Sequence, residues 1–363
     1  MKYVKRLDRC QRRMSDKDAG LMILSPGSNL RYMTGIDIEP DGREVIFIIP
    51  SRGEPRLVVP DLLSGEVESS NHDVSFYGDE DNFGDILEGV LGEIGVPNGR
   101  VLLDNKMWEE VSQKIREKIV DREFGLASEV LKDVRMVKSE DEIAKIKKAS
   151  KIVDRVVEDI RDMNPVGKTE KQLAGFINNR MDDYGAEGCS FDTIVAAGEN
   201  GANPHNQPTD RKINSGEMVV LDFGCWIDGY ASDQTRTLVF GDEHPSREAH
   251  EIHDVVRTAQ EQAVQSVKPG IKAGHVDKMA RDIIEEAGYG DNFVHRTGHG
   301  IGLEVHENPE IKKGNDEMLR PGMIFSVEPG IYLEDNLGVR IEDLVLVTEN
   351  GFEILNKTSR SFN

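Results

Sequence analysis

Carboxylates interrupt three apolar stretches in the second half of this 363-residue chain. Asp222 ends the run Met218-Val-Val-Leu, Glu328 follows Ile324-Phe-Ser-Val, and Glu342 lies between Val339-Arg-Ile and Leu344-Val-Leu. Each stretch has the composition of a buried strand, and a buried carboxylate without a partner destabilises a fold by several kcal/mol. The three acids must therefore hold a proton or share a cation. Asp233, in the polar run Ser-Asp-Gln-Thr-Arg, is a fourth candidate.

A hairpin is predicted between Asp222 and Asp233. The pair Asp228-Gly229 is a turn signal flanked by strand-like residues, and a hairpin there would bring both acids to one face. His299 adds an imidazole within Thr297-Gly-His-Gly-Ile-Gly, where glycines let the backbone approach a ligand closely.

These five side chains predict a centre for two divalent cations. Four carboxylates carry four negative charges, which two divalent cations would balance, while the imidazole is neutral. Oxygen-rich coordination with a single nitrogen favours Mn²⁺, Co²⁺ or Zn²⁺ over copper, and no thiolate pattern for structural zinc is present. Two such ions can activate water for attack on a carbonyl near neutral pH.

The elements that must position these residues are predicted from residue 191 onward. Two helices are expected at about 246–267 and 273–287, among strand-like runs at 194–197, 218–223, 237–240, 323–327, 339–341 and 344–347. Runs of strands broken by helices, rather than strict alternation, indicate an α+β fold with a largely antiparallel sheet.

The N-terminal part is predicted to be a separate α/β domain. Residues 1–130 alternate short apolar runs with helical patterns such as 83–94 and 108–119. Ser139-Glu-Asp-Glu142 is a capping box that opens a long amphipathic helix, and Thr169-Glu-Lys-Gln172 opens a second. A long helix suits a domain connector, so we expect domains at 1–135 and 136–363.

Charge and composition exclude several classes of protein. Asp and Glu number 67 against 45 Lys and Arg, and the net charge of −22 argues against a nucleic-acid binder. Apolar runs are too short to cross a membrane. The three cysteines, Cys10, Cys189 and Cys225, match no disulfide framework, and the charged N-terminus lacks a signal-peptide core. A cytoplasmic location is the expectation.

The motifs around these ligands resemble the pita-bread metallopeptidases, specifically the proline-directed branch of prolidase (Xaa-Pro dipeptidase) and Xaa-Pro aminopeptidase. The resemblance covers most of the chain, and the family's five metal ligands fall in order on Asp222, Asp233, His299, Glu328 and Glu342. It implies a creatinase-type N-terminal domain, a pita-bread catalytic domain, two divalent metal ions (Mn, Co or Zn) per subunit, short proline-containing peptides as substrates, and a homodimer.

The resemblance also implies roles for further residues. His205, in Asn-Pro-His-Asn, and His306, in Glu-Val-His-Glu, match the family's substrate-handling histidines. An imidazole donor near the scissile carbonyl would stabilise the charge that develops there. Glu328 would take a proton during the reaction, and Arg340 is expected to orient Glu342 or the substrate.

Three alternatives compete with a prolidase. An Xaa-Pro aminopeptidase would use the same site on longer peptides, a relative on the same fold could act on a non-peptide substrate, and a metal-free domain could serve only for binding. A separate pair, His250 and His253, has helical spacing, and we expect it to lie on a solvated helix face because no further ligand completes a metal site.

Overall fold

The computed structural model describes residues 2–39, 41–68 and 70–362, and the chain divides into two compact units, Met1–Arg135 and Met136–Asn363. Each unit contains both helices and strands, and each has its own apolar core. The α+β fold class is therefore confirmed. No helix among the described residues is both long and apolar enough to cross a membrane.

The first unit is built on a six-stranded mixed sheet in the order β4-β3-β2-β1-β5-β6. β1 pairs with β2 antiparallel and with β5 parallel, at the centre of the sheet. The strands are β1 Ala19–Leu24, β2 Ile46–Pro50, β3 Arg56–Pro60, β4 Asp73–Tyr77, β5 Arg100–Leu103 and β6 Phe124–Leu126. The helices are α1 Lys2–Asp16, α2 Ser28–Thr34, α3 Phe83–Ile94, α4 Glu109–Lys118 and α5 Ser128–Met136, with a 3₁₀ turn at Asp61–Val67.

Both predicted capping boxes begin helices of the second unit. The Ser139 side chain accepts a hydrogen bond from the backbone of Glu142, whose own side chain returns to the Ser139 backbone, and α6 runs over Glu140–Met163. Thr169 and Gln172 make the same reciprocal pair at the start of α7, Glu170–Asp183. The apolar face of α6 packs with α7 against strands that include Val219 and Leu221.

The strands of the second unit form small antiparallel sheets. One has the order β11-β8-β7, and a five-stranded one has the order β13-β12-β14-β17-β18. Two hairpins, β9-β10 and β15-β16, complete the set. The strands are β7 Ile194–Ala197, β8 Met218–Phe223, β9 Trp226–Ile227, β10 Tyr230–Ala231, β11 Gln234–Val239, β12 Gly298–Gly300, β13 Glu307–Ile311, β14 Ile324–Val327, β15 Gly330–Leu333, β16 Leu337–Arg340, β17 Asp343–Thr348 and β18 Gly351–Ile354.

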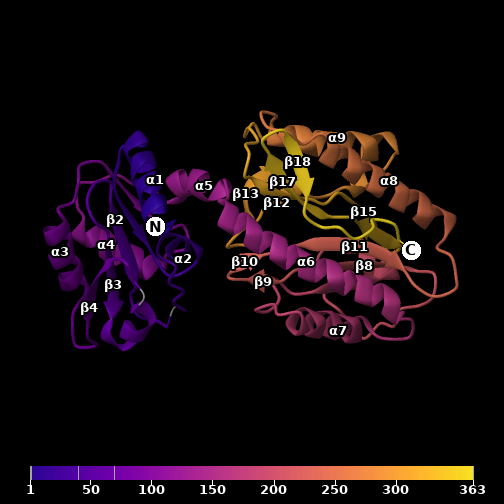
Figure 1. Ribbon diagram of the computed structural model, residues 1–363, viewed down its shortest axis with the longest axis horizontal. Helices are drawn as coiled ribbons and strands as arrows, with labels where there is room; N and C mark the ends of the chain where they lie inside the picture. The colour runs from indigo at the N-terminus through magenta and orange to yellow at the C-terminus, as the bar shows by residue number, and fades with distance from the viewer. Residues whose placement is uncertain (1, 40, 69, 363) are drawn as a thin grey trace. The chain divides into compact units, whose positions relative to one another are not determined.

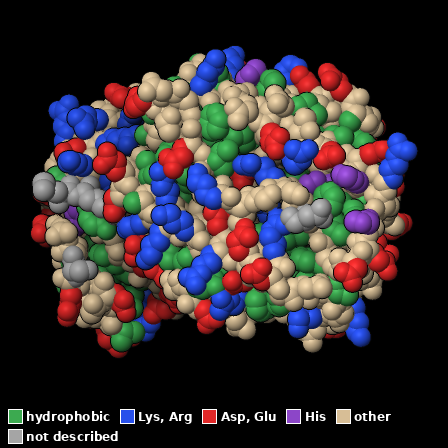
Figure 2. All heavy atoms as spheres, turned by 45° about the vertical axis from the view of Figure 1, so that its right-hand side comes forward, with side chains coloured by type: hydrophobic (Ala, Val, Ile, Leu, Met, Phe, Trp, Pro, Cys, Tyr) green, Lys and Arg blue, Asp and Glu red, His purple; other side chains and the backbone are tan. Residues whose placement is uncertain are grey.

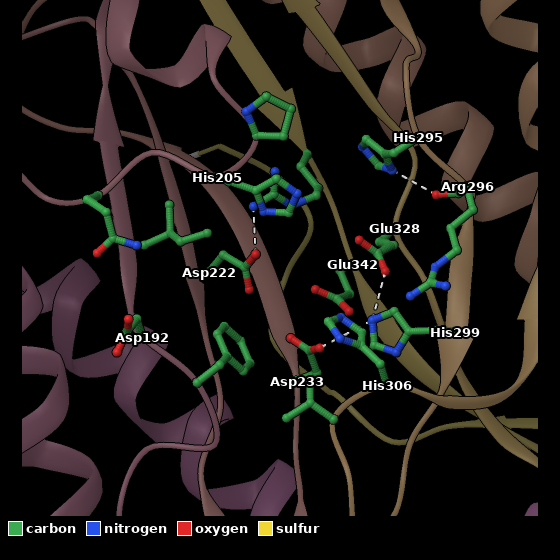
Figure 3. A pocket seen from close by; sticks show the side chains of 16 residues that line it. Asp192, His205, Asp222, Asp233, His295, Arg296, His299, His306, Glu328 and Glu342 are labelled. Carbon is green, nitrogen blue, oxygen red and sulfur yellow. Dashed lines mark hydrogen bonds and ion pairs between the residues drawn. The ribbon is translucent and has the colours of Figure 1, made fainter. Parts of the chain in front are cut away.

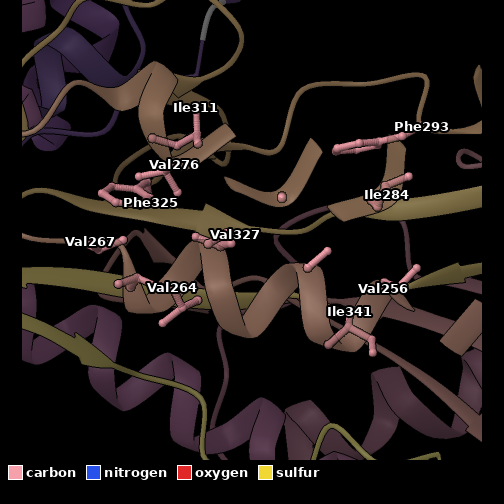
Figure 4. Packing of buried hydrophobic residues seen from close by; sticks show 14 of the residues in the cluster. Val256, Val264, Val267, Val276, Ile284, Phe293, Ile311, Phe325, Val327 and Ile341 are labelled. Carbon is pink, nitrogen blue, oxygen red and sulfur yellow. The ribbon is translucent and has the colours of Figure 1, made fainter. Parts of the chain in front are cut away.

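Helix pairs cover these sheets from two sides, as Figure 1 shows for α6 with α7 and for α8 with α9. α8 spans Arg247–Gln265 and α9 spans Ala273–Glu286. Their apolar faces meet β14 in a core that contains Val256, Val276 and Phe325 (Figure 4). The strands between the two helix pairs are thereby held on both faces, and the polar ends of several of these strands are directed to one cavity.

Candidate metal centre

The hairpin predicted between Asp222 and Asp233 is present. β8 and β11 pair antiparallel with Asp222 opposite Thr235, and Asp233 immediately precedes β11. The chain turns at Asp228, whose φ of 48° places it in the left-handed region that asparagine and aspartate tolerate. Asp222 and Asp233 consequently line the same cavity.

The other three predicted ligands come from neighbouring strand ends. His299 lies in β12, Glu328 directly follows β14, and Glu342 lies between β16 and β17. The five-stranded sheet holds them in register, because β12 and β17 both pair with β14. Glu328 and Glu342 thus lie where strands end, so that the strands are buried and each of these ends presents a carboxylate to the cavity.

The five side chains converge on one cavity of about 470 Å³. His299 Nε2 lies 3.1 Å from Glu328 Oε1 and 3.6 Å from Asp233 Oδ2. One ligand atom each from Asp233, His299 and Glu342 lies within 4.8 Å of the other two. Figure 3 shows the carboxylates turned toward one another, with Asp222 completing the group.

Crowding of acids at this centre raises most of their pKa values. Burial, followed by repulsion from the neighbouring carboxylates, raises the pKa of Asp233 and of Glu342 well above the ordinary range. Burial also raises the pKa of Asp222, although the charge of Arg340 opposes the shift. Burial would raise the pKa of Glu328 too, but the hydrogen bond and charge of His299 outweigh it and lower that pKa to about 2.

The positions of the oxygen and nitrogen atoms in these five side chains also fit divalent cations. Asp222 Oδ1 and Glu342 Oε1 are buried and have no hydrogen-bond partner among the described residues. His299 Nδ1 lies 3.1 Å from the carbonyl oxygen of Gly300, so this nitrogen is the donor and Nε2 faces the carboxylates. Unpartnered oxygens and an outward ring nitrogen around one point are the ligands that a metal ion satisfies.

Neighbouring side chains fix the ligands in place. Arg340 is 3% exposed and donates to Asp222 Oδ2 over 2.6 Å, rather than to Glu342 as the sequence suggested. Glu342 instead accepts a hydrogen bond from the Thr235 hydroxyl at 2.7 Å. The reason is the β8-β11 register, which puts Thr235 between the two acids, where its hydroxyl also accepts from Arg340 Nε at 3.2 Å.

A second chain of contacts begins at Arg340. Arg340 Nη1 donates to the Tyr332 hydroxyl at 2.8 Å, and that hydroxyl lies 2.8 Å from His295 Nε2. Burial lowers the pKa of His295, which keeps the ring neutral at pH 7. Ser326, in β14, donates to Glu328 Oε1 at 2.8 Å and accepts from the His299 backbone.

Both predicted substrate-handling histidines line the cavity. His205 and His306 are exposed to it, on separate segments that lie outside the strands (Figure 3). The His306 and His299 rings meet edge to face, with centroids 4.3 Å apart. Loss of water within the cavity and the neighbouring His299 lower the pKa of His306 to about 4, so its ring is neutral at pH 7.

Sequence reasoning missed three polar residues that hold the centre: Thr235, Ser326 and Tyr332. Thr235 and Tyr332 lie within the ligand motifs, and their even spacing from a ligand along a strand was an available signal.

The expectation that His250 and His253 both lie on a solvated helix face was half wrong. His250 is exposed, but His253 is 1% exposed and packs against Phe362 with ring centroids 5.0 Å apart, because it shares the buried face of α8 with Val256.

The fold and the donor set together define a metal-dependent enzyme with an oxygen-rich centre. Comparison with known proteins agrees. The model of metallopeptidase family M24 matches residues 144–349, and that of the Creatinase/Prolidase N-terminal domain matches residues 6–137. The chain belongs to metallopeptidase family M24, and it is therefore a hydrolase that works with a divalent metal.

Similar proteins include both solved and uncharacterised members. A prolidase from Thermococcus sibiricus is 39% identical, with a TM-score of 0.93 over 99% of this chain and 98% of its own. An X-Pro aminopeptidase from Thermotoga maritima is 34% identical, with a TM-score of 0.82 over 94% of this chain and 96% of its own. An uncharacterized peptidase of Staphylococcus epidermidis is 38% identical over 95% of this chain and 96% of its own length.

Proposed function

We propose that this protein is a dinuclear-metal exopeptidase that hydrolyses the peptide bond before proline in Xaa-Pro dipeptides, the activity of a prolidase. The observation that carries the proposal is the convergence of Asp222, Asp233, His299, Glu328 and Glu342 on one cavity, where two buried carboxylate oxygens have no partner in the described part of the chain. Five oxygen and nitrogen ligands with four acids suit two divalent cations, such as Mn²⁺, Co²⁺ or Zn²⁺. Similarity to a solved prolidase supports the substrate class.

Divalent cations in this centre would supply polarisation of the scissile carbonyl and a lower pKa for water. The chain supplies the proton acceptor. Glu328 lines the cavity, and the Ser326 hydroxyl and His299 fix its direction. It can therefore take a proton from water and return it to the leaving proline nitrogen.

His205 and His306 handle the substrate in this proposal. Their rings face the cavity, and a neutral imidazole can donate one hydrogen bond to a carbonyl oxygen. A donor placed there stabilises the charge that grows on that oxygen during attack. Arg340 is buried and held by Asp222 and Tyr332, so its role is to position Asp222. It also lines the cavity, where it could contact the substrate directly.

Proline explains why a dedicated site is useful. Its nitrogen carries no hydrogen and its φ angle is fixed, so proteases that bind a substrate as an added strand cleave before proline poorly. A closed centre that recognises a short peptide by its ends and by the scissile carbonyl avoids that requirement. We further propose that the protein is a cytoplasmic homodimer, the homodimer being what the resemblance to the family implies.

The second candidate is an Xaa-Pro aminopeptidase that trims longer peptides. The observation in its favour is the similarity to an X-Pro aminopeptidase over nearly the whole of both chains. The two candidates share the metal centre and differ in the length of peptide that they accept.

A hydrolysis panel tests the proposal. Xaa-Pro dipeptides, Xaa-Pro-Yaa tripeptides and matched Xaa-Ala dipeptides are offered to protein that has been stripped with a chelator, and again after Mn²⁺, Co²⁺ or Zn²⁺ is restored. We expect cleavage of Xaa-Pro only after metal is restored. Cleavage of tripeptides but not dipeptides would establish the aminopeptidase instead. Cleavage of no peptide would indicate a non-peptide substrate, and unchanged activity of the stripped protein would overturn the metal centre.

A further inference from the structure

A buried carboxylate outside the metal centre holds the segment that carries His205. Glu170 is the first residue of α7 and is 0% exposed. The segment in question, residues 198–209, connects β7 to the chain that leads into β8, and we call it the His205 loop. Pro204, His205 and Gln207 of this loop line the cavity.

Glu170 binds both ends of the His205 loop. Its Oε1 accepts hydrogen bonds from the Ala197 backbone nitrogen at 2.8 Å and from Asn200 Nδ2 at 2.9 Å. Its Oε2 accepts from Thr209, at 2.9 Å from the backbone nitrogen and 2.6 Å from the hydroxyl. The entry and the exit of the loop are therefore fixed to a single side chain.

Near its start, the loop also lies against β16, the strand that carries Arg340. A Cβ added at Gly338 in β16 would lie 1.8 Å from the carbonyl oxygen of Gly201, so only glycine allows this approach of the two backbones. β16 ends at Arg340, which holds Asp222. Between this contact and Thr209, the chain turns through Asn203, whose side chain accepts from the His205 nitrogen at 3.1 Å.

The donors around Glu170 require a carboxylate. An ionised carboxylate only accepts hydrogen bonds, and both of its oxygens face backbone N–H groups here. A glutamine would place its NH₂ group against one of those two donors in either orientation of the amide. One end of the loop would then lose its hydrogen bond to this side chain, and a buried N–H would lose its partner.

We propose that Glu170 is a positioning residue that sets the place of His205 in the cavity by holding both ends of the His205 loop. The inference rests on the proposed role of His205 toward the substrate. Glu170 itself touches neither the cavity nor the metal ligands among the described residues. Its effect on the reaction should therefore pass through His205 alone and leave the metal centre intact.

Hydrogen exchange of the metal-free protein tests the structural half of the proposal. We expect Glu170→Gln to speed amide exchange across residues 198–209. The matched control is Glu142→Gln, another buried carboxylate in the first turn of a helix. Its oxygens face Ser139 and the hydroxyl of Tyr230, which can accept from an amide, and Gln172 fills the same capping position in α7. The control should leave exchange in the His205 loop unchanged, and unchanged exchange in Glu170→Gln would overturn the proposal.

A double-mutant cycle on the metal-loaded enzyme tests the functional half. We expect Glu170→Gln to lower kcat/KM for an Xaa-Pro dipeptide by about tenfold to a hundredfold, the effect of a displaced reacting group. In the background of His205→Ala the same change should have no further effect, and the affinity for Mn²⁺ should stay at the wild-type value. Losses that multiply in the double variant, or weaker Mn²⁺ binding, would overturn a role through His205.

Thr209→Val keeps the test decisive if Glu170→Gln does not fold. It removes the hydroxyl that donates to Glu170 and accepts from Asn200 Nδ2 and the Arg211 backbone nitrogen, and it leaves the carboxylate in place. We expect a smaller rise in exchange and a smaller fall in kcat/KM, again absent in His205→Ala. If exchange rises but His205→Ala retains full activity, Glu170 still holds the loop while the proposed role of His205, and the positioning role with it, is wrong.

Discussion

At the scale of single residues, the metal centre is a place where acids are held closer than their charges favour. Asp233 and Glu342 are almost fully buried and neighbour two further carboxylates, while Arg340 is the cation that pairs directly with one of the four acids. Such an arrangement weakens the metal-free fold and is relieved when divalent cations bind. The proposed affinity for metal and the expected instability without it would therefore have the same origin.

The substitution Glu342→Gln separates these two properties. The amide keeps an oxygen for the Thr235 hydroxyl and places NH₂ at the position of the unpartnered Oε1, where neighbouring carboxylates can accept from it. We expect the metal-free variant to be more stable than the metal-free wild type, by about 1–3 kcal/mol, and to bind Mn²⁺ much more weakly. Denaturant unfolding and calorimetric titration measure the two effects, and a metal-free variant less stable than wild type would contradict the account.

His253 provides a pH dependence away from the metal centre. Burial lowers the pKa of His253 to about 4, although the charge of Asp254 opposes the shift. In the unfolded chain its pKa is near the ordinary 6.5. Between these two values the unfolded chain binds a proton that the folded chain excludes, so stability falls as the pH falls from 6.5 toward 4. The loss should reach about 2–3 kcal/mol at pH 4.

His253→Leu should remove this part of the acid sensitivity. The charged and titratable groups that also act on the ring, Arg257 and His250, lie on the same helix and remain in the variant. Unfolding free energies measured by urea titration from pH 7 to 4 should decline less steeply in the variant than in wild type. The exposed His250 offers the control, since His250→Gln should keep the wild-type slope, and equal slopes in all three proteins would refute the role of His253.

The residues themselves could be predicted from the sequence only where their chemistry conflicts with their surroundings. Asp222, Glu328 and Glu342 stand out because each interrupts or ends an apolar run, and the structure brings them together. Thr235 and Tyr332 show no such conflict, and their even spacing from a ligand is a weaker signal, because a hydroxyl is ordinary in a strand and its partner depends on register. The direction of Arg340 was missed for the same reason, since only the β8-β11 pairing shows which acid it reaches.

At the scale of elements, local signals with a defined chemistry predicted the helices well. Ser139 and Thr169 cap α6 and α7 as expected, and the pattern at 83–94 matches α3. Strand ends were harder to place. The run 237–240 captured only the apolar end of β11, which starts at Gln234, because the buried residues at 234–237 are polar and are satisfied by partners distant in sequence.

Strands whose formation depends on pairing with distant parts of the chain have no sequence pattern from which they could be predicted. β13 contains Pro309 and only two buried positions, so its composition does not mark a strand. β4 and β6 are edge strands with partly exposed side chains. Their pairing is decided by the neighbouring strand, which a local window cannot contain.

One ion pair ties the start of the second unit to the segment that carries His306. Lys138 Nζ lies 3.2 Å from Glu307 Oε2, with side chains 1% and 6% exposed, and Glu307 Oε1 accepts from the backbone of Glu304. We expect Lys138→Met to destabilise the second unit by about 3 kcal/mol, because the buried Glu307 loses this cation. Thermal unfolding monitored by circular dichroism measures the change.

The pair also makes a prediction about rescue. Adding Glu307→Gln to Lys138→Met removes the negative charge of Glu307, which has lost Lys138 in the single variant. The double variant should therefore recover at least half of the lost stability. The exposed pair Lys171 and Asp210, 3.0 Å apart, serves as the control, and Lys171→Met should change the stability by less than about 1 kcal/mol. A double variant less stable than Lys138→Met would show that the two side chains contribute independently.

At the scale of the whole molecule, the strong negative charge is distributed rather than gathered at the centre. Acidic and basic side chains are interspersed over the face in Figure 2, and many form ion pairs on single helices, such as Arg247 with Glu251. The net charge of −22 therefore favours solubility and disfavours nucleic-acid binding, while the proposed metal affinity would come from the few buried acids of the second unit. Composition indicated the effect of net charge on solubility and nucleic-acid binding, and only the positions of the motifs indicated a metal centre.

Because each unit has its own core and the ligands all belong to the second, metal removal should act on one unit only. Metal at 100 times its dissociation constant stabilises the unit that binds it by about 2.7 kcal/mol, and a chelator removes this increment. Scanning calorimetry of the full chain should show two transitions, of which chelation lowers one. Glu342→Gln is the control, since its transitions should not respond to the chelator. A lowered transition assigned by hydrogen exchange to residues 2–135, or equal shifts of both, would place the stabilising metal outside the proposed centre.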